Sequence, residues 1–232
     1  MKVLTFNLCW EAMTMNKTNL RRNGGHAKYL GEKCVVNKKG DATICLDNIV
    51  KMIDHEKTYD VIALQEALNY QTLIKKSRSL KKMKYYKSRS GKEILITFYN
   101  SSKYKLVKAY SSEFVKGRPF HVILLETKRG KQIVVVNLHT GHKELSKKLY
   151  IQKTLDKFLR ETIDLTNKKL IVLGDFNNNK IKTLKVMGRK LNSSKKKYRE
   201  IVDNVLSDEK VKINRYLKCD LGSDHIGLVC ET

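Results

Sequence analysis

Side chains that could do chemistry stand just beyond four short apolar runs of this sequence. They belong to Asn7, Glu66, His139, Asp175 and Asn177. Carboxylate and amide oxygens are the ligands that Mg²⁺ prefers, and the ion commonly takes one or two protein carboxylates together with water and substrate phosphate. A histidine beside such a site can move protons to and from phosphate oxygens. The set predicts metal-assisted chemistry on a phosphate ester.

A second histidine has a similar setting. His225 ends the segment Ser223-Asp224-His225 and directly precedes an apolar run at residues 226–229. One histidine alone is more often a structural residue than a catalytic one. Two histidines at strand ends, in a chain that also carries candidate metal carboxylates, favour an acid–base pair.

The apolar runs themselves must position these side chains. They cover residues 3–6, 61–64, 133–136 and 170–173 and are nearly continuous and rich in β-branched residues. Runs of this kind are typical of strands that are buried on both faces. A polar residue at one strand end is a common cap for a turn. Four such ends in one chain are better explained by a shared site at the rim of a sheet.

Other segments have helical or hairpin patterns. Apolar residues at helical spacing predict an amphipathic helix at about residues 43–57, a longer helix after His139 and a shorter one after Asn177. The positions concerned are Leu46, Ile49, Val50 and Ile53; Leu145, Leu149, Phe158 and Leu159; and Ile181, Leu184 and Leu191. Residues 93–136 have the pattern of successive strands, with a hairpin turn at residues 128–131. Helices packed on central sheets are expected.

The length and composition favour one domain. The chain has 232 residues, of which 41% are hydrophobic, and no segment has the composition of a linker. We expect a single domain at residues 1–232. Residues 14–42 show little periodicity and are expected to form a long loop or an insertion.

The charge is strongly positive. There are 48 Lys and Arg residues against 23 Asp and Glu residues, a formal net charge of +25. Such a field attracts polyanions, of which nucleic acid is the most common. Basic tracts that also contain tyrosine lie at residues 75–89 and 195–198, and Lys81 and Lys82 of the first are expected to contact a nucleic-acid backbone. The alternative is that these lysines form a solvated surface.

The cysteines predict reduced thiols in an intracellular protein, cytoplasmic or nuclear. The five residues are an odd number without the spacing of a disulfide framework: Cys9, Cys34, Cys45, Cys219 and Cys230. The spacing of His26, Cys34 and Cys45 also fits no standard pair of zinc ligands. The N-terminal segment lacks the pattern of a signal peptide, and no window has the apolar length of a membrane span.

Five short blocks occur in the order and spacing of the endonuclease/exonuclease/phosphatase superfamily, and the chain resembles its DNase I-like members. The blocks are Phe6-Asn7, Leu64-Gln65-Glu66, Asn137-Leu138-His139, Gly174-Asp175-Phe176-Asn177 and Ser223-Asp224-His225. The resemblance covers nearly the whole chain except residues 14–42. It implies an α/β (α+β) fold, a four-layer sandwich of two central mixed β-sheets flanked by helices.

The resemblance also implies roles for individual residues. Glu66 would be the main ligand of Mg²⁺, for which Mn²⁺ can substitute, with Asn7 and Asp224 as further metal contacts. Glu93 would brace His139, and Asp203 would orient His225. The implied catalytic set is His139, His225, Asp175, Asn177, Asp203 and Glu93. Arg118 and Asn137 are expected to contact the substrate.

The implied reaction is in-line attack of water on phosphorus, with the two histidines as acid and base in an order that the sequence leaves open. The charge favours a nuclease acting on DNA or RNA. The alternatives are a phosphatase or phosphodiesterase acting on a phosphoinositide, a phospholipid or a protein–DNA adduct, and a catalytically silent nucleic-acid-binding relative. Loss of Glu66, Asp175 or His225 would mark the silent relative, and all three are present.

Overall fold

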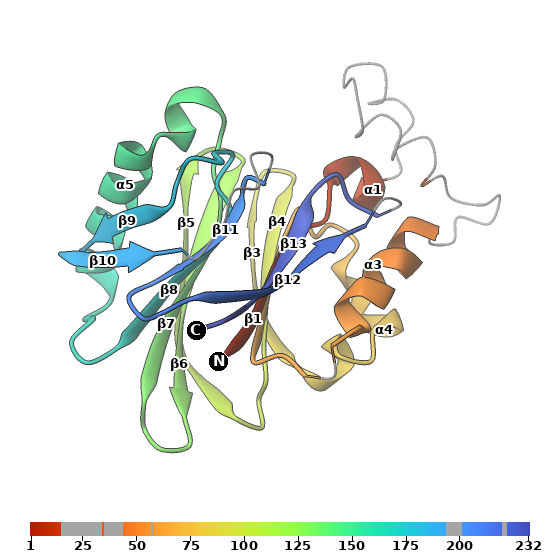
Figure 1. Cartoon of the computed structure of the whole chain (residues 1–232), viewed down its shortest axis with the longest axis horizontal. Helices are drawn as coiled ribbons and strands as arrows, with labels where there is room; N and C mark the ends of the chain where they lie inside the picture. The colour runs from red at the N-terminus through yellow and green to blue at the C-terminus, as the bar shows by residue number, and fades with distance from the viewer. Residues whose placement is uncertain (15–33, 35–43, 57, 194–200, 220–221) are drawn as a thin grey trace.

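Two β-sheets pack face to face in the computed structural model, and helices cover the outer face of each sheet (Figure 1). The structure describes residues 1–14, 34, 44–56, 58–193, 201–219 and 222–232. Residues such as Val3, Ala63, Val135 and Ile171 fill the space between the sheets. The predicted four-layer sandwich is confirmed.

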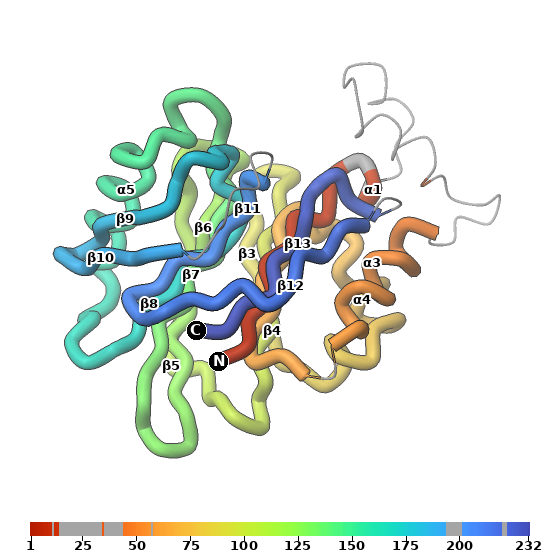
Figure 2. Tube along the Cα trace, viewed as in Figure 1, coloured from red at the N-terminus to blue at the C-terminus, as the bar shows by residue number. Residues whose placement is uncertain are grey.

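The first sheet, sheet A, has six strands in the order β12-β13-β1-β2-β4-β3. Their bounds are β1 Lys2–Asn7, β2 Val61–Gln65, β3 Lys84–Ser90, β4 Glu93–Tyr99, β12 Lys212–Lys218 and β13 Ile226–Glu231. The two ends of the chain lie side by side in this sheet (Figure 2), where the Met1 amino group donates to the Thr232 carbonyl at 2.8 Å.

The second sheet, sheet B, has seven strands in the order β5-β6-β7-β8-β11-β10-β9. Their bounds are β5 Tyr104–Val115, β6 Arg118–Thr127, β7 Gln132–His139, β8 Lys169–Asp175, β9 Thr183–Val186, β10 Arg189–Asn192 and β11 Asp203–Ser207. The predicted succession of strands at residues 93–136 is confirmed, including the turn at residues 128–131.

The four predicted buried strands are β1, β2, β7 and β8, and they form two parallel pairs. In one pair Asn7 lies opposite Gln65, and in the other His139 lies opposite Asp175. Nδ2 of Asn7 also donates to Oδ2 of Asp175 across the two sheets at 2.9 Å. The carboxyl ends of all four strands therefore meet at one end of the sandwich.

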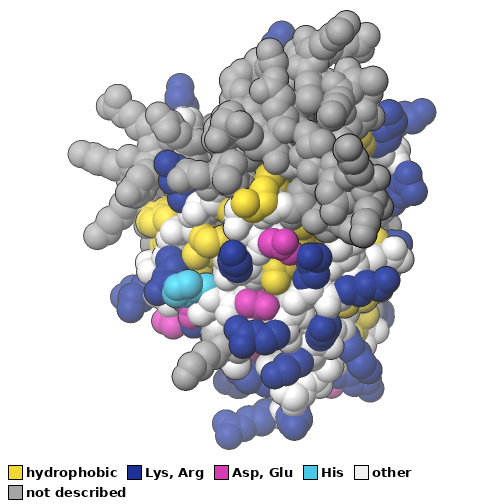
Figure 3. Space-filling model, turned by 90° about the vertical axis from the view of Figure 1, so that its right-hand side faces the viewer, with side chains coloured by type: hydrophobic (Ala, Val, Ile, Leu, Met, Phe, Trp, Pro, Cys, Tyr) yellow, Lys and Arg dark blue, Asp and Glu magenta, His cyan; other side chains and the backbone are white. Residues whose placement is uncertain are grey.

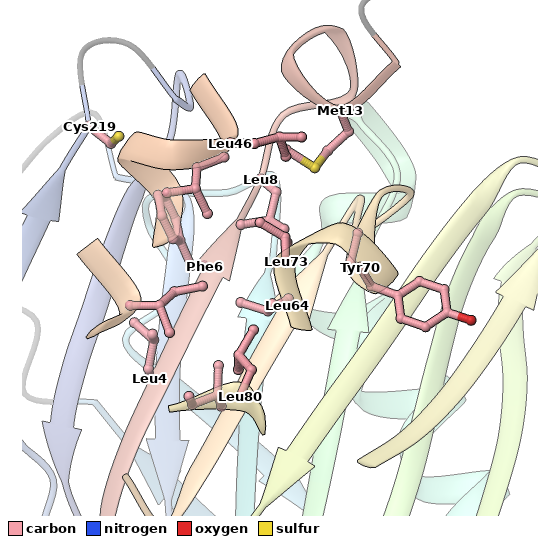
Figure 4. Close-up of a cluster of buried hydrophobic side chains, with 14 of the residues drawn as sticks. Leu4, Phe6, Leu8, Met13, Leu46, Leu64, Tyr70, Leu73, Leu80 and Cys219 are labelled. Carbon is pink, nitrogen blue, oxygen red and sulfur yellow. The ribbon is translucent and has the colours of Figure 1, made fainter. Parts of the chain in front are cut away.

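Sheet A is covered by α1 (Trp10–Thr14), α3 (Ile44–Asp54), α4 (Tyr70–Lys76) and the 3₁₀ turn η2 (Leu80–Lys82). The apolar face of α3 predicted by its spacing is buried, with Leu46, Ile49 and Ile53 inside. Figure 4 shows Leu46 of α3 and Leu73 of α4 packed over Phe6 and Leu64 of the sheet. This packing fixes the strand ends that carry Asn7 and Glu66.

Sheet B is covered by α5 (Lys148–Thr162), which follows the 3₁₀ turn η3 (Lys143–Ser146). This is the longer helix predicted after His139, and its Ile151, Leu155 and Leu159 are buried. Leu149, which the helical pattern placed on the apolar face, is 60% exposed instead. The helix begins only at Lys148, so Leu149 lies in its first turn, outside the buried stripe.

The shorter helix predicted after Asn177 is wrong, because that segment forms the hairpin of β9 and β10. Burial alternates along β9, with Leu184 and Val186 inside and Lys185 exposed. Met187 and Gly188 turn the chain at positive φ of 48° and 77°, as two-residue hairpin loops require. Leu184 and Leu191 are therefore spaced as in a helix only because they lie opposite each other on two strands that face the same core.

The expectation of reduced thiols is wrong for one pair, because Cys34 and Cys45 form a disulfide. Both side chains are fully buried, and Cys45 lies in the first turn of α3. His26, considered with them as a zinc ligand, lies outside the described residues. Among the helices that the structure describes, none combines the length and apolar character needed to cross a membrane.

Candidate active site

Two turns and one strand glycine position polar side chains at the end of the sandwich. Glu66 follows β2 with φ of 54°, and Asn177 follows β8 with φ of 46°. Left-handed backbone outside glycine is uncommon, and it concentrates at functional sites. Gly174 has φ of 136°, and a Cβ there would stand 2.0 Å from the Leu138 carbonyl oxygen. Only glycine allows β8 to approach β7 this closely just before Asp175.

A compact group is formed by Glu66, Glu93 and His139. Their candidate ligand atoms all lie within 4.8 Å of one another. Oε1 of Glu93 accepts from the backbone N–H of Glu66 at 2.9 Å and lies 3.2 Å from Nδ1 of His139. Glu93 is therefore occupied with positioning, whereas Oε1 of Glu66 has longer contacts, 3.4 Å to Nδ2 of Asn7 and 3.9 Å to Nε2 of His139. Glu66 is the better metal ligand of the two.

The electrostatics of this group fit a divalent cation. Burial, together with the carboxylates of Glu93 and Asp175, raises the pKa of Glu66 to about 7, and the two histidines oppose that rise. Three carboxylates in one buried place repel one another unless a cation lies between them. Carboxylate oxygens with the Asn7 amide nearby form a hard-oxygen donor set. The site can therefore hold a divalent metal ion.

His139 is enclosed, with 2% of its side chain exposed. Its Nε2 lies 3.3 Å from Oδ2 of Asp175 and 2.8 Å from Nη1 of Arg118. Burial opposes protonation of His139, but Asp175, Glu93 and Glu66 outweigh it and raise the pKa. Since Arg118 can only donate, Nε2 accepts in this contact. The structure thus brings Arg118, Glu93 and Asp175 together around His139.

His225 faces the same carboxylate from the other side. Its Nδ1 lies 2.7 Å from Oδ2 of Asp203, and its Nε2 lies 3.8 Å from Oδ2 of Asp175. Burial lowers the pKa of His225, but Asp203 and Asp175 raise it well above its usual range. Asp224 is a third, weaker neighbour at 3.9 Å from Nε2. Asp224 does not join the Glu66 group.

Asp175 lies between the two histidines and is 1% exposed. Burial alone would raise its pKa, but His139, His225 and hydrogen bonds from Asn177 and Asn7 lower it. The backbone N–H of Asn177 donates to Oδ1 of Asp175 at 2.7 Å. Nδ2 of Asn177 donates to the Thr140 carbonyl at 2.7 Å, which fixes the amide at the rim. Asp175 is therefore an ionised carboxylate that contacts both histidines.

Asn137 does not reach the cleft, contrary to the expected substrate contact. Its side chain is fully buried between the sheets. Oδ1 accepts from Gln65 at 2.8 Å, and Nδ2 donates to Thr97 at 3.1 Å and to the carbonyls of Ile96 and Leu64. All these partners belong to sheet A, so Asn137 ties the two sheets together beneath the site.

Lys81 and Lys82 are also not brought to the site. They lie in η2 just before β3, whose first residue Lys84 pairs with Tyr99. The site lies at Glu93, the opposite end of the same β4 strand. Figure 3 shows lysine and arginine side chains spread over the face of the molecule that bears α3 and α4. These cations cover the helical layer of sheet A.

A residue that the sequence reasoning missed is His142. Burial and the nearby Arg118 lower its pKa, whereas Asp175 raises it. His142 is exposed and lies in the loop that follows β7, whose last residue is His139. The signal was its spacing three residues after His139, in the segment His139-Thr140-Gly141-His142.

No model of a known protein family matches the chain. A curated relative, the uncharacterized protein L684 of Acanthamoeba polyphaga mimivirus, is 32% identical over 187 residues, which are 76% of this chain. The chain spans about a third of the length of that relative, of which the match covers 34%.

Solved structures share the fold over the full chain. The catalytic domain of human nocturnin with bound sulfate has a TM-score of 0.67 and 16% identity, covering 99% of this chain and 93% of that one. The 2′,3′-cyclic phosphatase ANGEL2 has a TM-score of 0.68 and 14% identity, with the same coverage. An endonuclease/exonuclease/phosphatase family protein from Bacteroides thetaiotaomicron has a TM-score of 0.64 and 16% identity, covering 99% and 96%. The chain has the DNase I-like fold of the endonuclease/exonuclease/phosphatase superfamily.

Proposed function

We propose that the protein is a magnesium-dependent phosphodiesterase, a nuclease that hydrolyses DNA or RNA, and that residues 1–232 act as one domain. The observation that carries this proposal is the convergence of two histidines on one carboxylate. Nε2 of His139 and Nε2 of His225 lie 3.3 Å and 3.8 Å from Oδ2 of Asp175. Each ring is held through Nδ1 by a second carboxylate. Such an arrangement suits proton transfer on both sides of one phosphorus atom.

His225 is the better candidate for activating the attacking water. Its side chain is 18% exposed, whereas that of His139 is 2% exposed. Nδ1–H donated to Asp203 leaves Nε2 facing the cleft, where the neutral ring can accept the proton of a water molecule; the raised pKa of His225 makes that ring a strong base, which is neutral only at higher pH. Asp203 then stabilises the imidazolium that forms. Asn177 and Asp224, at the rim, are placed to hold that water or a phosphate oxygen.

His139 and Arg118 act on the opposite side of the phosphate. In the structure Nη1 of Arg118 occupies Nε2 of His139 at 2.8 Å. A phosphate oxygen attracts a guanidinium more strongly than an imidazole does. Arg118 turning to the phosphate frees Nε2, and the surrounding carboxylates favour a proton there. His139 would then donate that proton to a phosphate oxygen or to the leaving group.

Glu66, with Asn7 beside it, would hold the metal. A divalent cation supplies Lewis-acid stabilisation of the charge that develops on the phosphate oxygens. The donor set of carboxylates and an amide fits Mg²⁺, with Mn²⁺ as a substitute. Oε1 of Glu93 contacts both the backbone N–H of Glu66 and Nδ1 of His139, and so holds the two residues in fixed positions relative to each other.

The proposed substrate rests on charge. A formal net charge of +25 draws polyanions to the whole molecule. The runner-up is a phosphatase or phosphodiesterase acting on a small phosphoester, a phospholipid or a protein–DNA adduct. ANGEL2 is named as a 2′,3′-cyclic phosphatase, so proteins of this fold differ in substrate.

The decisive experiment is a hydrolysis panel with Mg²⁺ and with a chelator. The substrates are plasmid DNA, single-stranded DNA, structured RNA, poly(A) RNA and inositol phosphates. We expect cleavage of a nucleic acid that stops with the chelator and with Glu66→Ala, and that survives in the control Glu209→Gln, a surface carboxylate that is 61% exposed. A Glu66→Ala protein that keeps more than about a tenth of the rate would contradict the metal role, which should supply several kcal/mol. Cleavage of inositol phosphates alone would favour the runner-up.

A further inference from the structure

In Figure 1, α5 and the β9–β10 hairpin lie side by side. Between them, outside the catalytic cleft, lies a groove. Its volume is about 650 Å³. The residues that line it are Leu149, Gln152, Lys153, Asp156, Lys157, Arg160, Lys185 and Gly188. A volume of this size, within the ~300–1,000 Å³ range of small-ligand sites, accommodates a short stretch of a strand rather than a duplex.

The walls of the groove are joined by hydrogen bonds. Oε1 of Gln152 on α5 accepts from the backbone N–H of Lys185 on β9 at 3.2 Å. A carboxylate oxygen of Asp156 accepts from the backbone N–H of Met187 in the hairpin turn. The helix and the hairpin therefore form a fixed channel rather than two independent surfaces.

The groove carries an excess of positive charge. Lys153, Lys157 and Lys185 are exposed, and none has an ion-pair partner in the part of the chain that the structure describes. Among the lining residues the carboxylate belongs to Asp156, which is already paired with Nε of Arg160 at 2.8 Å. No acidic group is left to repel an anion. Cations on successive helical turns face a cation on the hairpin.

Hydrogen bonds tie the segments that form the groove to the loops that follow His139 and Asn177. Nδ2 of Asn178, next to Asn177, donates to the Ser146 carbonyl at 2.8 Å. Nζ of Lys148, the first residue of α5, donates to Oγ1 of Thr183, the first residue of β9, at 2.7 Å. From Leu149 to Arg160 the helix lines the groove over about 16 Å, at ~1.5 Å per residue.

We propose that this groove binds the sugar–phosphate backbone of a single nucleic-acid strand whose scissile phosphate lies in the catalytic cleft. The proposal rests on the proposed phosphodiesterase function and extends it to a strand several nucleotides long. Lys153, Lys157 and Lys185 neutralise phosphates, and Leu149, 60% exposed at the groove, offers an apolar surface to a base. An acidic peptide would match the charge of the groove, but it has no phosphodiester that the catalytic cleft could bind.

The test measures binding without turnover. Fluorescence anisotropy of an end-labelled single-stranded oligonucleotide, as DNA and as RNA, is followed over a range of salt concentrations in a Glu66→Gln background. One variant is K153Q/K157Q/K185Q. The matched control, K105Q/K128Q/K131Q, removes the same charge from exposed lysines at the end of sheet B opposite the site.

Each phosphate contact contributes about −0.7 to the slope of log affinity against log salt for a single strand, so three contacts should flatten the slope by about 2. If the plots of log affinity against log salt for the parent protein and for the groove variant meet near ~1 M salt, the affinity of the variant at ~0.1 M is lower than that of the parent on the order of 100-fold. The control variant should change far less. Equal effects of the two variants, or none from the groove variant, would overturn the proposal.

Four further readouts separate the outcomes. A duplex that binds as tightly as the single strand and loses as much affinity would contradict a strand in the groove, as would an acidic peptide that competes as well as the oligonucleotide. The single variant Lys185→Gln should flatten the slope by about 0.7, which covers the case in which the triple variant misfolds. Binding that depends on the groove without hydrolysis of any phosphoester would leave the groove supported and refute the proposed function.

Discussion

Nδ1 of His225 lies 2.7 Å from Oδ2 of Asp203, and this contact joins the loop before β13 in sheet A to the first residue of β11 in sheet B. The pair therefore spans the two sheets at the site. Its geometry depends on how the sheets pack and not on either strand alone.

Asp203→Asn should reduce kcat while the protein stays folded, because the amide supports the ring less well and no longer stabilises the imidazolium. Removal of a general base costs about 10²–10⁴-fold in rate, and we expect His225→Ala in that range with Asp203→Asn at its lower end. Steady-state kinetics of both variants and of the double variant test this. Additive losses would show that the two residues do not act as a unit.

Arg118→Gln should raise KM and lower kcat/KM about 10–100-fold, because a charge-assisted hydrogen bond to phosphate contributes roughly 1.5–3 kcal/mol. Arg118→Lys should recover only part of this, since lysine cannot bind in a bidentate way. Arg89→Gln is the control, an exposed arginine of the neighbouring hairpin that donates to the Gly91 carbonyl at 2.9 Å. Equal losses in Arg118→Gln and Arg89→Gln would indicate that Arg118 acts only through the overall positive charge of the protein and not through a specific contact with the phosphate.

His121 should make the protein sensitive to acid. Its ring is fully buried between Ser88 and Thr97, at 2.8 Å and 2.7 Å, and burial lowers its pKa to about 3. Below the ordinary value of 6.5 the unfolded chain binds a proton that the folded state excludes. Stability therefore falls as the pH falls from 6.5, by about 1.4 kcal/mol per unit.

His121→Gln should remove that part of the pH dependence. Urea unfolding at about pH 7 and about pH 5 would show wild type losing roughly 2 kcal/mol more than the variant. The exposed His55→Gln should behave as wild type. A variant with the wild-type pH slope would mean that His121 can be protonated in the folded state.

Asn137→Leu tests whether this residue supports the fold or the substrate. The leucine leaves the Gln65 and Thr97 groups without their partner, which should cost about 1–3 kcal/mol for each unsatisfied group. KM, measured well below the melting temperature, should stay near the wild-type value. Thr97→Val, in the same network, should destabilise the protein in a similar way. A raised KM with unchanged stability would restore the substrate role.

The strands and the cluster of candidate catalytic residues could be predicted from sequence because their signals are local. The apolar runs that precede Asn7, Glu66 and Asp175 are each a few residues long, and each ends where the side chain must face the site. Parallel pairing then brings the ends together without further information from the sequence. The order of the blocks supplied the rest of the fold.

The misplaced residues depend on distant contacts. Asn137 is one residue of a motif that also contains His139, and both side chains point between the sheets, yet Asn137 meets Gln65 and Thr97 instead of the cleft. The sequence shows that Lys81 and Lys82 are basic but not where they lie. The pairing of β3 with β4 shows that they are at the end of sheet A opposite the site. Apolar residues at β9 and β10 matched a helical period by coincidence, because the turn at Met187 is not visible in spacing alone.

The position of β1 constrains when the protein can fold. β1, which begins at Lys2, pairs with β2 on one side and with β13, which ends at Glu231, on the other (Figure 2). During synthesis β1 must wait with one edge unpaired until β13 has left the ribosome, and the loop that the pairing closes is nearly as long as the chain. Contacts of such sequence separation slow folding, and an open apolar edge invites association with other chains. A nascent chain stalled before β13 should therefore need a chaperone, although all the proposed catalytic residues, of which His225 is the last, have already been made.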